Sequence, residues 1–225
     1  MTECHTLLIS DIHIGSKICR TEKVIKLLET ASFKALIING DLFDSKIIKA
    51  FNKDHWRLIS LLADIASKKE VILVGGNHGR ELDNIVKNMG IEIKDDHFFT
   101  IGTKKILCLH GDQFDPFVTH MPMTSRVFGN IFYNLQKLDG QDQESAMLVK
   151  KFSKRFLGIT SGRQKNLATR HAAKEKADII ICSHTHIPHI GTKNGILYIN
   201  SGSFCEHPCT FVAIDKNGKA RLEKI

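Results

Sequence analysis

Five apolar, strand-like stretches of this 225-residue chain end in Asp, Asn or His, which are residue types that bind divalent metals. The endings are Asp11-Ile12-His13, Gly40-Asp41-Leu42-Phe43-Asp44, Gly75-Gly76-Asn77-His78, His110-Gly111-Asp112 and His184-Thr185-His186. One such ending alone is usually an ordinary turn closed by a polar residue. Five of them at strand exits, where sites in α/β sheets usually lie, indicate a shared site.

The spacing within these endings suits metal ions. In extended chain, residues two apart point the same way, so Asp11 and His13 can face one cation, as can His184 and His186. Asp41 can bridge two cations through its carboxylate. Ligands of this kind favour Mn²⁺, Fe²⁺ or Zn²⁺ over Ca²⁺ or Mg²⁺. Seven such groups exceed one tetrahedral site, and with one shared carboxylate they supply two sites of four ligands each, which suits phosphoryl chemistry.

Alternating strands and helices are expected to position these endings. Strands are predicted at residues 6–10, 36–39, 71–74, 97–101, 105–109, 178–182, 195–199 and 210–214. Helices are predicted at 22–30, 47–68 and 81–89 from their apolar spacing. Gly102 is expected to close one hairpin, and residues 215–218 a second hairpin that leads to the last strand.

The strand pattern stops between residues 114 and 177. This segment holds 11 Lys and Arg against 5 Asp and Glu, a net of +6, which is most of the chain's +8. A helix predicted at 142–157 would place apolar side chains on one face. Its opposite face would carry Lys150, Lys151, Lys154 and Arg155. The pattern fits either an ordinary surface helix with solvated lysines or a cationic, lid-like insertion that closes over an amphiphilic anion.

Length and composition are typical of a soluble globular protein, and they suggest one domain spanning residues 1–225 with an insertion. No apolar stretch approaches the roughly 18 residues of a membrane-spanning helix, and the N-terminus does not resemble a signal peptide. We therefore expect a cytoplasmic protein that could touch the inner membrane surface. The six cysteines form no Cys-x-x-Cys pair and are expected to be reduced and structural. A net charge of +8 suggests an anionic partner such as phosphate, nucleic acid or an acidic membrane face.

In their order, the five endings resemble those of the calcineurin-like metallophosphoesterases, over residues 7–202. The resemblance implies two mixed β-sheets packed face to face with flanking helices. It implies a first metal held by Asp11, His13, Asp41 and His186, and a second held by Asp41, Asn77, His110 and His184. It also implies that His78 is the acid that protonates the leaving oxygen and that Asp44 orients His78.

Within this family, the chain is similar to UDP-2,3-diacylglucosamine pyrophosphatases, which release UMP and a lipid phosphate during lipid A synthesis. The matching stretches are residues 10–15, 40–44, 110–115 and 200–206. Two departures matter. Those pyrophosphatases typically carry Arg where this chain has His78. The family often has an acid where this chain has Gly79-Arg80, so Arg80 is expected either to contact substrate phosphate or to be a surface arginine at a helix start.

We therefore expect a hydrolase with two divalent metal ions, Mn²⁺ first and Fe²⁺ or Zn²⁺ as alternatives. Its reaction would be hydrolysis of a phosphodiester or pyrophosphate bond in a nucleotide-sugar lipid of the UDP-2,3-diacylglucosamine type. A nuclease or small-nucleotide phosphodiesterase on the same fold is the alternative, which the positive charge permits. A non-catalytic scaffold, like the retromer subunit of this fold, is a third possibility that the intact ligand set disfavours.

Overall fold

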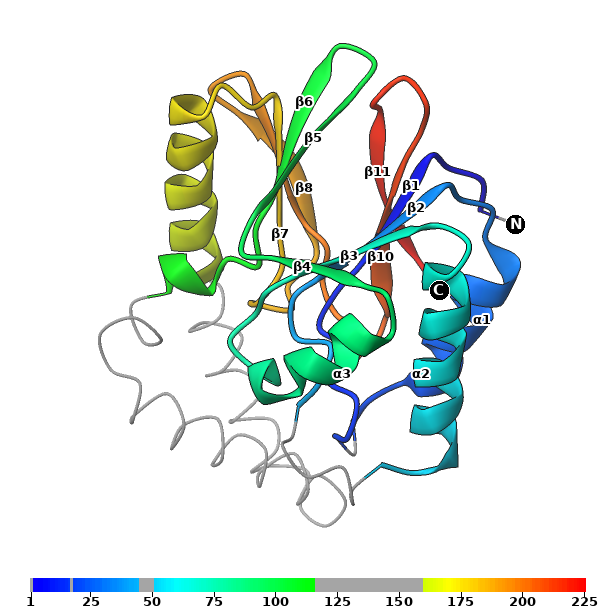
Figure 1. The fold of residues 1–225 in the computed structure, drawn as a ribbon. Helices are drawn as coiled ribbons and strands as arrows, with labels where there is room; N and C mark the ends of the chain where they lie inside the picture. Colours follow the sequence, from blue (N-terminus) through cyan, green and yellow to red (C-terminus); the bar gives the residue numbers. More distant parts are fainter. Residues whose placement is uncertain (1, 17, 45–50, 116–159) are drawn as a thin grey trace.

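The computed structural model describes residues 2–16, 18–44, 51–115 and 160–225 as two β-sheets packed face to face, with helices outside them (Figure 1). The first sheet has the strand order β11-β10-β1-β2-β3-β4. Its strands are β1 (Thr6–Ile9), β2 (Ala35–Asn39), β3 (Glu70–Val74), β4 (Glu92–Lys94), β10 (Thr210–Ile214) and β11 (Ala220–Lys224). Strands β1 to β4 are parallel, and β10 and β11 are antiparallel additions.

The second sheet has the order β5-β6-β7-β9-β8. Its strands are β5 (His97–Ile101), β6 (Lys104–Cys108), β7 (Ile179–Cys182), β8 (His189–Lys193) and β9 (Ile196–Asn200). Strands β6, β7 and β9 are parallel to one another, and the two edge strands are antiparallel. The predicted architecture of two mixed sheets with flanking helices is therefore confirmed.

The apolar runs of the central strands reflect burial on both faces. Leu7 and Ile9 belong to the cluster beneath the helices of the first sheet, whereas Leu8 packs in the cluster between the two sheets. All three are fully buried. Alternate residues of a strand face opposite sides, so a strand covered on both sides reads as a continuous apolar stretch.

Three helices pack against the first sheet: α1 (Thr21–Thr30), α2 (Lys53–Ala66) and α3 (Asp83–Asn88). A 3₁₀ turn, η2 (Arg80–Leu82), precedes α3. The prediction of one continuous helix at 47–68 is wrong at its start. The Asn52 side chain accepts a hydrogen bond from the His55 N–H, and His55 Nδ1 accepts one from the Asn52 N–H. This capping box starts α2 at Lys53, because it satisfies N–H groups that lack partners within the helix.

A helix at residues 160–174 covers the outer face of the second sheet (Figure 1, left). Ala168 and Ala172, which are fully buried, belong to a cluster with Leu107 and Tyr198. This end of the segment predicted as an insertion is thus a layer of the core. Residues 116–159 lie outside the described residues, and with them the predicted helix at 142–157 and Lys150, Lys151, Lys154 and Arg155.

Two short strands, β4 and β8, were not expected from the sequence. Both are edge strands, and β8 alternates between half-buried and exposed residues around Gly191. Such strands lack the apolar run of a central strand. Both predicted hairpins are present, and all six cysteines are free thiols. Within the described ranges, no helix has the length and apolar character needed to span a membrane.

Candidate metal centre

The predicted site residues gather at one end of the sandwich, opposite the β5–β6 and β10–β11 turns (Figure 1). Strands β1, β2 and β3 run parallel in the first sheet, as do β6 and β7 in the second. Within each sheet the carboxyl ends of these strands therefore reach one edge, and the 3.4 Å contact between Asp41 Oδ2 and His110 Nε2 joins the edges of the two sheets. The loops at this edge carry Asp11 and His13, Asp41 and Asp44, Asn77 and His78, His110, and His184 and His186, in the order of these strands.

The i, i+2 spacing suggested that these side chains stand on extended backbone, but the loops hold most of them in a left-handed conformation. Five of the seven described non-glycine residues with positive φ are expected ligands. They are Asp11 (48°), His13 (52°), Asp41 (46°), His184 (66°) and His186 (58°). Left-handed conformations are uncommon for such residues and persist where the surrounding structure enforces them. The N–H groups of Ile12 and His13 both donate to the Asp41 carbonyl, at 3.1 and 3.0 Å, which ties the first two loops together.

Asp11, His13 and His186 form what we call the first half-site. Each offers one ligand atom, and these atoms lie within 4.8 Å of one another. His186 Nε2 approaches Asp11 Oδ1 at 3.2 Å. Nevertheless, neither Asp11 oxygen nor His13 Nε2 has a hydrogen-bond partner among the described residues, and all three atoms are buried. This half-site therefore presents unsatisfied acceptors to its centre.

Asn77, His110 and His184 form the second half-site. The Asn77 side-chain oxygen lies 3.1 Å from both His110 Nε2 and His184 Nδ1. On its far side, His110 Nδ1 lies 3.2 Å from the Asn39 carbonyl and 2.9 Å from Ser183 Oγ. A proton on Nδ1 is therefore held away from the centre, and Nε2 is presented to it.

Asp41 lies between the two half-sites and is almost fully buried. Its Oδ2 lies 3.7 Å from His13 Nε2 and 3.4 Å from His110 Nε2, while Oδ1 accepts a hydrogen bond from the His78 N–H at 2.9 Å. One carboxylate thus contacts a histidine of each half-site. Gly40 and Gly76 permit this packing, because a Cβ there would lie 2.0 Å from His110 Nδ1 and 2.1 Å from Asp41 Oδ1.

The electrostatics of the site favour positive charge. Burial would raise the pKa of Asp41, but the adjacent His110 lowers it well below its usual range. Burial opposes the charged form of His110 too, yet Asp41 raises the pKa of this ring to about 10. Burial likewise opposes the charged form of His186, whose pKa Asp11 raises to about 10. Paired buried carboxylates therefore stabilise cations here, whether protonated imidazole or metal.

Asp44 lies closer to His13 than to His78. Its Oδ1 is 3.2 Å from His13 Nδ1 and 3.9 Å from His78 Nδ1. The hydrogen bond with His13 is the largest influence on Asp44 and lowers the pKa of its carboxyl. His78 lies at the rim with 46% of its side chain exposed, and burial of the remainder lowers its pKa. Asp44 therefore contacts a predicted ligand and the predicted acid, with the tighter contact to the ligand.

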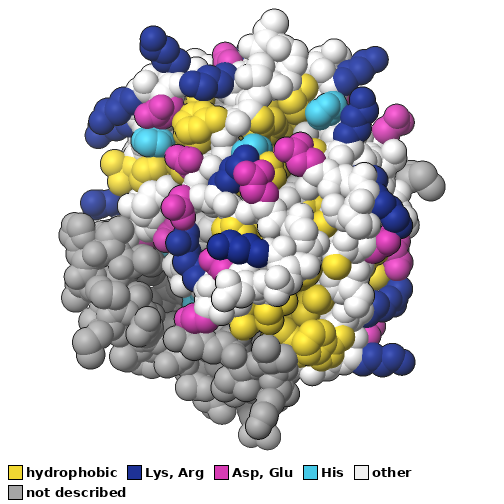
Figure 2. Space-filling model, viewed as in Figure 1, with side chains coloured by type: hydrophobic (Ala, Val, Ile, Leu, Met, Phe, Trp, Pro, Cys, Tyr) yellow, Lys and Arg dark blue, Asp and Glu magenta, His cyan; other side chains and the backbone are white. Residues whose placement is uncertain are grey.

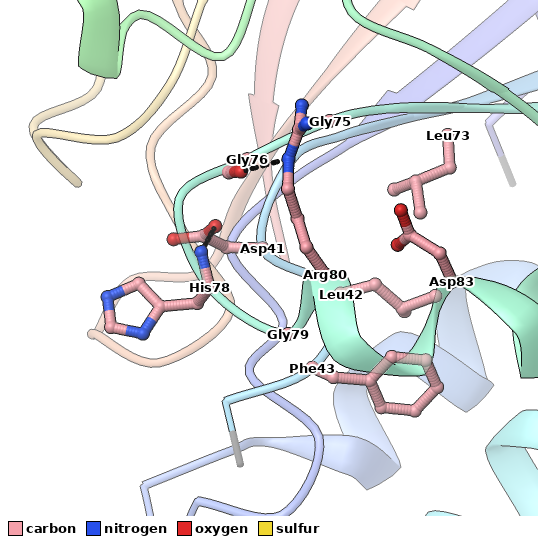
Figure 3. Close-up of a pocket in the computed structure, with 10 residues that line it drawn as sticks. All are labelled: Asp41, Leu42, Phe43, Leu73, Gly75, Gly76, His78, Gly79, Arg80 and Asp83. Atoms are coloured by element: carbon pink, nitrogen blue, oxygen red, sulfur yellow. Dashed lines mark hydrogen bonds between the residues drawn. The ribbon is translucent and has the colours of Figure 1, made fainter. Parts of the chain in front are cut away.

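Arg80 makes its hydrogen bonds to protein groups that are not part of either half-site. Its Nε donates to the Gly76 carbonyl at 2.9 Å, and its Nη2 donates to Asp95 Oδ1 at 2.7 Å. Figure 3 shows the Arg80 chain running towards Gly75, whereas the His78 ring points away from it. These contacts match an arginine that fastens the start of a helix, and they turn the guanidinium away from the half-sites.

Sequence reasoning missed the outer partners of the histidines. His184 Nε2 lies 3.0 Å from Asp115 Oδ2, and His186 Nδ1 lies 3.6 Å from Glu206 Oε1. Ser183, with Asn39, does the same for His110. Such partners orient metal-binding imidazoles. Only proximity to the motifs could have indicated them, because acidic residues in loops are common without this role.

Several solved structures share the fold of this chain. The Escherichia coli phosphoesterase YfcE is 18% identical, covering 98% of this chain and 97% of that chain, with a TM-score of 0.52. A structurally characterised archaeal phosphodiesterase is 16% identical, covering 98% and 99%, with a TM-score of 0.51. Chaetomium thermophilum Vps29 is 14% identical, covering 98% and 96%, with a TM-score of 0.52. At these identities the similarity shows a shared fold.

A curated relative is the DNA polymerase II small subunit of Thermoplasma acidophilum, 22% identical over 227 residues. The match covers 87% of this chain but 44% of the relative, so this chain spans less than half of that protein's length. The family model described as "Calcineurin-like phosphoesterase" matches residues 5–188. This chain therefore belongs to the calcineurin-like phosphoesterase family, whose members are hydrolases that use two divalent metal ions on phosphate-containing substrates.

Proposed function

We propose that this protein hydrolyses a phosphodiester or pyrophosphate bond with two divalent metal ions, one in each half-site. The proposal depends chiefly on Asp41, whose Oδ2 lies within 3.7 Å of a histidine from each half-site. The first ion would be held by Asp11, His13, Asp41 and His186, and the second by Asp41, Asn77, His110 and His184.

The residues present fit such ions. Buried acceptors without donors are costly, and Asp11 offers two such oxygens beside the unpaired His13 Nε2. A cation at this point would compensate all three atoms. Carboxylate, imidazole and amide donors together suit Mn²⁺, Fe²⁺ or Zn²⁺, and we propose Mn²⁺. When bound, two such ions activate water and stabilise charge on a phosphoryl group.

His78 is proposed to donate the proton to the leaving oxygen. Its N–H is fixed by Asp41 Oδ1, so the backbone is anchored while the ring stays accessible at the rim. Asp44 would support both its neighbours, holding His13 at 3.2 Å and limiting the rotation of His78 at 3.9 Å.

The substrate proposed first is a nucleotide-sugar lipid of the UDP-2,3-diacylglucosamine type, hydrolysed at the cytoplasmic face of the inner membrane. Its support is the similarity of the four sequence stretches that include residues 110–115 and 200–206. On the face of the described residues in Figure 2, Lys and Arg are interspersed with Asp and Glu. Any lid that selects this substrate would depend on Lys150, Lys151, Lys154 and Arg155.

A nuclease or small-nucleotide phosphodiesterase is the second candidate. One observation favours it: the 22% identity to a protein named as a DNA polymerase small subunit. The same site would serve a nucleic-acid diester, since water attacks a phosphoryl group in both reactions. The two candidates therefore differ in what binds beside the metals.

One experiment separates these candidates. The Mn²⁺-loaded protein is incubated in parallel with UDP-2,3-diacylglucosamine, single-stranded DNA and cyclic dinucleotides, and products are identified by mass. UMP and a lipid phosphate would support the first candidate, and nucleotide fragments the second. If protein with two bound ions hydrolyses none of these substrates and no small chromogenic diester, the proposed activity is contradicted and a scaffold is favoured.

The predicted lid has its own test. Neutralising Lys150, Lys151, Lys154 and Arg155 together should raise the KM for the lipid substrate more than the KM for a small chromogenic diester. The reason is that a cationic cover attracts the larger anionic substrate along more of its length. Equal effects on both substrates would remove the lid from the proposal.

A further inference from the structure

Gln164 lies in the helix at residues 160–174, far in sequence from every metal motif, and is 2% exposed. Both ends of its amide are bonded. Nε2 donates to the carbonyl of Ser183 at 3.0 Å and, at 3.3 Å, to that of Gly111. Oε1 accepts from the Tyr198 hydroxyl at 2.8 Å and from Asn200 Nδ2 at 3.0 Å. The side chain is therefore a fully satisfied polar group within the core, which is the kind of group that fixes geometry.

The two carbonyls that accept from Gln164 Nε2 each lie next to a proposed metal ligand. Gly111 directly follows His110, and Ser183 directly precedes His184. One side-chain amide thus fastens the backbone beside two histidines from different strands. The loops are also joined directly, because the Ser183 N–H donates to the His110 carbonyl at 2.9 Å. Gly111 leaves the necessary space, since a Cβ there would lie 2.3 Å from Gln164 Nε2.

We propose that Gln164 is a positioning residue for the second half-site: it sets the spacing between His110 and His184 and so controls binding of the second metal ion. This inference rests on the proposed function, because it takes both histidines as ligands. Neither the Asp11 nor the His13 loop receives a hydrogen bond from Gln164 among the described contacts. His186 of the first half-site lies on the same loop as Ser183, but it is held separately by Asp11 at 3.2 Å and by Glu206 at 3.6 Å. The first ion should therefore depend far less on Gln164.

Removing the amide should act through the backbone. Without Nε2, the Gly111 carbonyl keeps the Phe114 N–H at 3.1 Å and the Ser183 carbonyl keeps Asn200 Nδ2 at 2.8 Å, but the one side-chain amide that joins these two carbonyls is lost. The spacing between the two loops is then no longer fixed by a shared donor. Each adjacent histidine would move with its carbonyl. Loss of an outer contact of this kind lowers metal affinity about 10- to 100-fold, and we expect that range for the second ion.

The test is a Mn²⁺ titration of the full-length chain, followed by electron paramagnetic resonance and by counting bound ions. The wild-type protein should bind two ions and give the spectrum of an exchange-coupled pair. Gln164→Met keeps the length of the side chain but removes its donors and acceptor. At limiting Mn²⁺ it should show the spectrum of a single ion, with affinity for the first ion unchanged and affinity for the second reduced about 10- to 100-fold.

Two matched controls separate positioning from simple loss of stability. Tyr198→Phe removes a donor to the same amide but leaves both loop carbonyls bonded. Thr169→Val alters a buried hydroxyl on the same helix that bonds only to the Lys165 and Asn166 carbonyls among the described residues. Each control should lower the melting temperature and retain the exchange-coupled spectrum at wild-type Mn²⁺ concentrations.

The inference is overturned if Gln164→Met binds the second ion as the wild type does, if it loses both ions in parallel, or if a control weakens the second ion equally. Should Gln164→Met fail to fold, Gln164→Glu is judged by the same criteria. Glu is nearly isosteric with Gln, keeps Oε1 and lacks the amide NH₂ group. A wild-type chain that binds one ion would instead overturn the proposed function, and this inference with it.

Discussion

The two half-sites differ in how far the protein completes their hydrogen bonding. In the second half-site, the Asn77 side-chain oxygen lies 3.1 Å from a ring nitrogen of both histidines, and His110 is held from behind by Asn39 and Ser183. In the first half-site, both Asp11 oxygens and His13 Nε2 are buried without a hydrogen-bond donor or acceptor from the described residues. The protein thus holds the second half-site on more sides, whereas the first leaves three buried atoms that a cation would compensate. Four predictions test this difference, from the largest expected effect to the smallest.

The shared carboxylate should matter most. Asp41→Asn keeps the shape but removes the negative charge that faces both half-sites, so both ions and the activity should be lost together. Bound metal is counted by elemental analysis, and hydrolysis of a chromogenic diester is followed. Asp112→Asn, which changes another acid beside His110, is the matched control and should keep both ions. Retention of two ions by Asp41→Asn would refute the bridge between the half-sites.

The rim residue His78 should affect turnover and leave both half-sites intact. His78→Ala removes the proposed proton donor and should slow turnover by about 10²–10⁴. Metal content should stay at the wild-type level, because the ring is not among the proposed ligands. Steady-state kinetics with metal analysis provide the measurement. An unchanged rate would remove His78 from the mechanism.

Single substitutions should then separate the two half-sites. Asp11→Asn should lose the first ion and keep the second, while Asn77→Ala should do the reverse. Because the protein holds the second half-site on more sides, Asp11→Asn should still bind its remaining ion with near wild-type affinity. Isothermal titration with Mn²⁺ measures both affinities. If either variant loses both ions, the half-sites do not bind independently and the comparison fails.

Metal-linked stability gives the smallest effect. An ion at 100 times its dissociation constant stabilises the fold by about 2.7 kcal/mol. For a chain of this size, each kcal/mol raises the melting temperature by about 2–4 °C. Calorimetry with and without Mn²⁺ should show the full rise for the wild type, a smaller rise for Asp11→Asn and none for Asp41→Asn. An equal rise in all three would place the stabilising Mn²⁺ outside these half-sites.

Much of the fold could be predicted because the central strands are buried on both faces. Leu7 and Ile9 pack beneath the helices, and Leu8 packs between the two sheets. All three are therefore apolar, and such a continuous apolar run can be recognised in the sequence. The edge strand β8 has no such signature, since Gly191 and its exposed neighbours resemble a loop. The start of α2 was misplaced because a capping box depends on one local hydrogen-bond pair, Asn52 with His55, more than on apolar spacing.

The sequence alone determined which residues come together at the site, because each motif follows an apolar strand and parallel strands end at one edge. Tertiary structure decided how they are held. The left-handed backbone of Asp11 and His184, the turn of Arg80 towards Asp95, and the reach of Gln164 to two loop carbonyls all depend on contacts between residues distant in sequence. The positions of the central strands follow from local apolar patterns, but the strand order and the hydrogen bonds across loops follow only from the packed arrangement of both sheets.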